Sequence, residues 1–115
     1  MFSLTVTRKV PSAKDVTLIC DCPDNVCLAD CIEVITTSVM SALTGNMRAA
    51  TPATVKAAAG KCKKLTITMD ATGDDWAGFP MSLPIPEAPP DLIAAVDAAL
   101  TACCSHPKVK KYLRP

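Results

Sequence analysis

The sequence predicts an α+β domain: a small, mainly antiparallel three-stranded sheet with helices packed on one of its faces. Three short segments alternate apolar and polar residues with period two, as half-buried strands do. Three other segments repeat apolar residues at helical spacing. The length of 115 residues fits one domain spanning residues 1–115. The expected element order is β-β-α-α-β-α.

The three strands are expected over residues 2–7, 16–22 and 64–69. The polar connection at residues 11–15 is short, so the first two strands should form a hairpin. The outward residues are mostly threonine and serine, which favours one solvated face. The expected inward residues are Phe2, Leu4 and Val6, then Val16, Leu18, Cys20 and Cys22, and finally Leu65, Ile67 and Met69.

The three helices are expected over residues 24–45, 51–60 and about 90–105. Asp24 is a suitable N-cap for the first, and Gly45 a suitable stop. The second would carry a proline at its first helical position, and the third would end before Pro107. The first helix carries an apolar stripe made of Leu28, Ile32, Ile35, Val39 and Leu43.

Residues 70–90 are predicted to form an extended, proline-rich arm. Its prolines exclude a central strand and favour an extended path. Two alternatives are open: the arm covers its own domain, or it lies on a neighbouring subunit, where large apolar side chains dominate contacts. The candidate partner-binding residues are Trp76, Phe79, Met81, Leu83 and Ile85.

Cys20, Cys22, Cys27 and Cys31 are the candidate metal ligands. Their spacing departs from the closely spaced pairs typical of structural zinc. Core packing as small hydrophobic residues explains the same four positions, and a disulfide remains an alternative in an oxidising environment. We therefore expect no bound metal and no other cofactor.

No catalytic constellation emerges from the sequence, so the protein is predicted not to be an enzyme. His106, the one histidine, follows two cysteines at a helix end, where a nucleophile–base pair rarely has the right geometry. The net charge of +1 gives no sign of a nucleic-acid partner, and the basic tail at residues 107–115 is expected to be solvated. No small-molecule substrate is inferred.

The residues give no export signal and no apolar run close to the ~20 residues of a membrane span. The seven cysteines are then expected to be reduced, in a protein that stays in the cytoplasm after synthesis, without a membrane partner.

The predicted function is that of a structural or assembly subunit that forms a homo-oligomer or docks on a larger protein complex. By analogy alone, the composition suits a bacteriophage capsid or tail component, which would be virion-associated. The alternative is a small metal-binding or thiol-redox domain built on the four clustered cysteines. A weaker alternative is a nucleic-acid-associated accessory protein.

Overall fold

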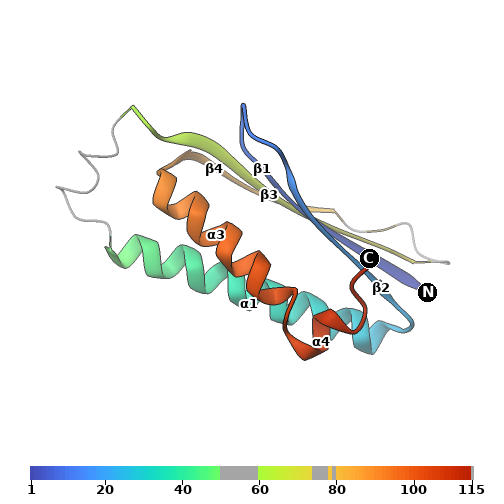
Figure 1. The fold of residues 1–115 in the computed structure, drawn as a ribbon. Coiled ribbons are helices and arrows are strands. Elements are labelled where there is room, and N and C mark those ends of the chain that lie inside the picture. Colours follow the sequence, from blue (N-terminus) through green and yellow to red (C-terminus); the bar gives the residue numbers. More distant parts are fainter. Residues whose placement is uncertain (50–59, 74–77, 79, 115) are drawn as a thin grey trace.

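The chain folds as a four-stranded antiparallel sheet with its helices on one side (Figure 1). This computed structural model describes residues 1–49, 60–73, 78 and 80–114. The sheet order is β2-β1-β3-β4, so β1 and β3 are the central strands. The elements are β1 (Phe2–Lys9), β2 (Val16–Cys22), α1 (Asn25–Ala49), β3 (Lys63–Gly73), β4 (Met81–Ala88), α3 (Pro90–Cys103) and α4 (Pro107–Lys110).

The α+β class and the β1–β2 hairpin are confirmed, but the prediction of three strands in the order β-β-α-α-β-α is wrong. The described residues follow the order β-β-α-β-β-α-α. The extra strand, β4, lies inside the predicted arm and pairs with β3. The predicted helix at residues 51–60 falls, apart from its last residue, outside the described residues.

The strand β4 tolerates its two prolines because it is an edge strand. Thr66 of β3 lies opposite Pro84, and Leu65 lies opposite Ile85. A proline nitrogen cannot donate a hydrogen bond, so Pro84 and Pro86 fit only where that position faces away from β3. The outer edge of β4 therefore lacks two of the donors that an added strand would need.

The first helix begins where the sequence predicts but ends later. The backbone N–H of Cys27 donates to Asp24 Oδ1 at 2.8 Å, which confirms the N-cap. The helix then passes the predicted stop at Gly45, where a Cβ would have no atom within 4 Å, so nothing in the packing requires a glycine. Asn46 Nδ2 donates to the Ala42 carbonyl at 3.0 Å, which ties that side chain to the preceding turn.

The apolar core lies between the sheet and the layer formed by α1 and α3. The strands β1, β2 and β3 contribute alternate residues, and α1 and α3 each contribute one stripe, while β4 and α4 contribute Ala88 and Val109. By length and composition alone, the segment Asn25–Asn46 of α1 could cross a membrane, a property that buried core helices share. Fully or almost fully buried members of the core include Leu4, Val6, Cys20, Cys22, Cys31, Ile35, Leu65, Val96, Leu100 and Val109.

One charged side chain, Arg8, lies within this core. It occupies an inward position of β1, and its side chain is only 6% exposed. Its Nε donates to Asp97 Oδ1 of α3 at 2.7 Å, and its Nη2 donates to Oδ2 at 3.2 Å. This bidentate pair joins the central strand to α3, while Nη1 is buried without a hydrogen-bond partner among the described residues.

The C-terminal tail is part of the fold, in contrast to the expectation of a solvated tail. The Asp21 N–H donates to the Tyr112 carbonyl at 2.9 Å, and the Arg114 N–H donates to the Ile19 carbonyl at 2.8 Å. Arg114 also binds the Asp21 carboxylate at 2.7 Å, which lowers the pKa of Asp21. The tail thus occupies the outer edge of β2, with Leu113 in a bridge to Cys20.

Candidate functional site

Cys20, Cys22 and Cys31 come together where β2 ends and α1 begins. Strand alternation turns the first two inward, and the first turns of α1 bring Cys31 against them. All three are completely buried. Cys22 Sγ lies 3.9 Å from Cys31 Sγ, and Cys31 Sγ donates to the Lys108 carbonyl at 3.4 Å. The thiols are therefore integrated into the packing of β2, α1 and α4.

Cys27, the fourth candidate, lies at the margin of this cluster. It is half-buried, and its Sγ lies 2.9 Å from the hydroxyl of Tyr112. This contact raises the pKa of Tyr112 to about 12. It also helps to hold the C-terminal tail against α1, so Cys27 has a structural contact of its own.

Burial disfavours the thiolate form of the inner cysteines. Desolvation, followed by the neighbouring Cys31, raises the pKa of both Cys20 and Cys22 to about 12. Burial also raises the pKa of Cys31. The thiolate is the nucleophile and the metal ligand, so neutral thiols are poor at either task. In the described part of the chain, no three His, Cys, Asp or Glu side chains are arranged to hold a metal ion.

We expect the buried thiols to resist alkylation in the folded protein. At pH 8–9, iodoacetamide should label the half-buried Cys27 and Cys62 well before Cys20 and Cys22, because groups with a pKa of about 12 remain protonated there. Mass spectrometry of peptides from a labelling time course would measure this order. Labelling in urea is the control, since all seven should then react. Rapid native labelling of Cys22 would show a thiol that is more accessible or more acidic than its packing implies.

His106 makes a structural contact at the start of α4. It precedes α4, and its Nδ1 accepts a hydrogen bond from the Lys108 N–H at 3.1 Å. The sequence placed it at the C-terminus of the third helix; in the structure it also caps the start of the next one. Cys103 is buried in the core.

The structure describes three of the five predicted partner-binding residues. Trp76 and Phe79 lie outside the described residues. Met81 and Leu83 are 46% and 40% exposed, while Ile85 is half-buried. These last three share one face of β4, and we call them the β4 apolar margin.

The β4 apolar margin lies on the helix side of the sheet. Leu83 pairs with Ile67, and Ile85 pairs with Leu65, whose side chains are both buried in the core. The half-buried Met69 lies opposite Met81 and extends the apolar surface onto β3. The described helices therefore leave the β4 edge of this sheet face partly open. The segment Met81–Ala88 of the predicted arm packs in cis, as a strand.

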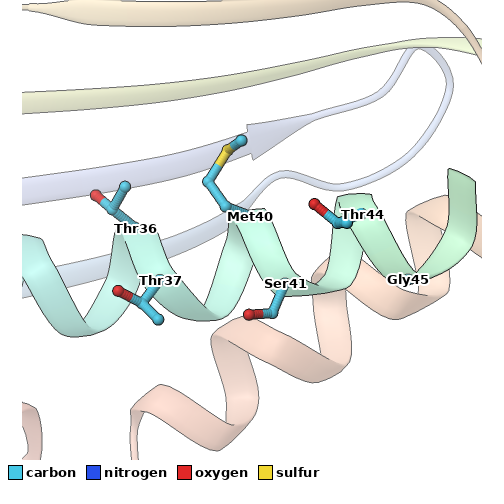
Figure 2. A pocket seen from close by; sticks show the side chains of 6 residues that line it. All are labelled: Thr36, Thr37, Met40, Ser41, Thr44 and Gly45. Atoms are coloured by element: carbon cyan, nitrogen blue, oxygen red, sulfur yellow. The ribbon is translucent and has the colours of Figure 1, made fainter.

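A shallow hollow lies along α1 (Figure 2). Figure 2 shows Met40 between Thr36 and Thr44 along the helix, with Thr37 and Ser41 beside them. None of its lining residues is titratable near neutral pH, so the hollow offers no acid, base or metal ligand. The lining residues are Thr36, Thr37, Met40, Ser41, Thr44 and Gly45.

Two features of the fold were not predicted from the sequence. The Arg8–Asp97 pair joins residues 89 positions apart, which no local pattern reveals. The apolar residues of the tail, Val109, Tyr112 and Leu113, recur at spacings of three and four, a packing signal that the surrounding lysines obscured.

Comparisons with known proteins leave the fold and its surfaces as the guide to function. No family model, no curated protein and no solved structure matches this chain.

Proposed function

We propose that this protein is a non-enzymatic structural subunit that associates with further copies of itself through the β4 apolar margin. The observation that carries the proposal is the exposure of Met81 and Leu83, two large apolar side chains that are neighbours on one strand face. With Met69 and Ile85 beside them, they form a contiguous surface rather than isolated exposed residues.

Both edges of the sheet are blocked, which favours association through side chains over the addition of a strand from a second copy. Pro84 and Pro86 remove donors from the outer edge of β4. The tail occupies the outer edge of β2 through Tyr112 and Arg114. Blocked edges prevent open-ended sheet growth. An apolar margin on a blocked edge strand can therefore serve a limited, specific contact.

Three polar side chains that could carry chemistry are engaged in the fold. Arg8 binds Asp97, Arg114 binds Asp21, and His106 caps α4. The raised pKa values of the clustered thiols favour the assembly proposal over a metal-binding or thiol-redox domain. A bacteriophage capsid or tail component remains the analogy for such a subunit.

The first test removes the apolar surface. Met81→Asp with Leu83→Asp should raise the concentration needed for association through the β4 apolar margin by roughly a hundredfold. Burial of such side chains contributes about 1.5–3 kcal/mol each, and each 1.4 kcal/mol is about a tenfold change. Sedimentation velocity over a concentration series would measure the shift.

Met40→Asp is the matched control, because Met40 is equally large and 49% exposed but lies on α1. It should leave the association unchanged. Thermal melting of both variants verifies the fold. If the β4 variant assembles like wild type, or if Met40→Asp weakens assembly equally, the β4 apolar margin is not the contact.

A further inference from the structure

The sheet face that the described helices leave uncovered forms a second surface, here called the open face. In Figure 1, α1, α3 and α4 all lie on the other side of the sheet. The burial of Leu4 and Val6 fixes the inward side of β1. Alternation therefore directs Thr5, Thr7 and Lys9 away from the helices.

The strand register arranges the open face into rows of short side chains. Thr7 lies opposite Thr17 of β2 and Thr68 of β3. The next row places Thr5 opposite Asp70 of β3. The strands contribute no aromatic side chain to these described rows, so they offer no stacking platform for nucleic-acid bases.

Charge is unevenly distributed along this face. On one side of the Thr7 row lie Lys9 and Lys64, both exposed and lining one shallow hollow at the end of the sheet. Asp15 lines the same hollow and offsets one of the two positive charges. On the other side of the Thr7 row lies the exposed Asp70.

A second acidic side chain at this end of the described sheet is paired. Asp21 occupies the outermost row with Ser3, but its carboxylate is bound by Arg114 at 2.7 Å. Among the described side chains, Asp70 therefore supplies the remaining charge at this end, while Lys9, Lys64 and Asp15 together leave the lysine end positive.

We propose that the open face binds the open face of a second copy of this chain, with the strands of the two copies antiparallel. The twofold axis lies between the two sheets, runs perpendicular to the strands and crosses the Thr7 row. It sets the Lys9 row of one copy over the Asp70 row of the other. Both rows lie two residues from Thr7, about 7 Å along the strand, so the match is symmetric. This inference rests on the proposed function, because it requires a self-associating subunit.

The charges select this orientation over the alternative. A twofold axis parallel to the strands would set lysine over lysine and Asp70 over Asp70, and like charges facing each other oppose association. In the antiparallel arrangement Lys9 and Lys64 of one copy flank Asp70 of the other. The contact is isologous, so each charge pair occurs twice.

A charge-exchange experiment tests the pairing. Variant A carries Asp70→Lys, and variant B carries Lys9→Glu with Lys64→Glu. Both are made in the Met81→Asp/Leu83→Asp background, so that only the open face remains for association. The background protein should be dimeric by native mass spectrometry. Variants A and B should each be monomeric, because like charges face each other in either homodimer.

An equimolar mixture of A and B should recover dimers of mixed mass, since lysines of A then face acids of B at both ends. Thermal melting shows that each variant remains folded. The inference is overturned if the background protein is monomeric, if A and B dimerise alone, or if the mixture stays monomeric. None of these results argues against the β4 contact. That contact is supported if the Met81→Asp/Leu83→Asp variant assembles less than the wild type. Failure of the β4 contact is detected separately, by unchanged assembly of that double variant.

Discussion

Replacing Leu65 or Ile35 with alanine should lower the free energy of unfolding by about 2–5 kcal/mol. Both side chains are completely buried, Leu65 on the inward face of β3 and Ile35 on the inward stripe of α1. Each substitution removes apolar contacts and leaves a cavity that the surrounding strands and helices fill only in part. Urea denaturation followed by circular dichroism would measure the loss.

Thr66→Ala is the matched control for Leu65→Ala, because it changes the neighbouring residue of β3 on the open face. It should cost far less, since Thr66 is only partly buried and its side chain points away from the helices. An equal cost at both positions would mean that the open face is covered in the dissolved protein. Repeating the denaturation at lower protein concentration would then show whether a second copy or the chain itself covers the open face.

Asp97→Ala should destabilise the protein by about 3 kcal/mol. Removing one partner of a buried ion pair typically costs about 3–5 kcal/mol, because the other charge is left unpaired. The lower end applies here, since the Asp97 side chain is 37% exposed and water can partly replace it. The Arg8 guanidinium would lose both of its hydrogen-bonded contacts to α3.

Asp91→Ala on the same helix is the control. Asp91 is exposed in the first turn of α3, where a negative charge contributes roughly 0.3–1 kcal/mol. Comparing the two unfolding curves isolates the buried pair. If Asp97→Ala costs no more than Asp91→Ala, the ion pair adds no net stability, and Arg8 is held by packing alone.

Strand alternation made the inward faces of β1, β2 and β3 predictable. The same parity directs Arg8 inward after Leu4 and Val6, so its direction could be predicted from the sequence. Its partner could not, because Asp97 lies on α3 and reaches Arg8 only through the tertiary arrangement.

The strand β4 was not predicted because its local and tertiary signals conflict. Pro84 and Pro86 argue against a strand on propensity alone, yet Met81, Leu83 and Ile85 alternate with period two. An edge position reconciles the two signals, because only one side of an edge strand needs its hydrogen-bond donors. The pairing with β3 decides the outcome, and that pairing is not encoded within the segment.

The candidate site, like the fold, was predictable where it depends on local patterns and not where it depends on long-range contacts. Alternation identified Met81, Leu83 and Ile85 as one apolar face, and the structure keeps two of them exposed. The clustering of Cys20, Cys22 and Cys31 was also expected from a strand end beside a helix start. The closure of the β2 edge by Tyr112 and Arg114 depends on a long-range contact that local patterns do not contain.

The most direct test of the central claim is the mass of the wild-type protein in solution over a concentration series, measured by sedimentation velocity and native mass spectrometry. Self-association predicts species larger than the 12.1 kDa chain, whose fraction rises with concentration. A single 12.1 kDa species at every concentration would contradict self-association, and with it both proposed contacts.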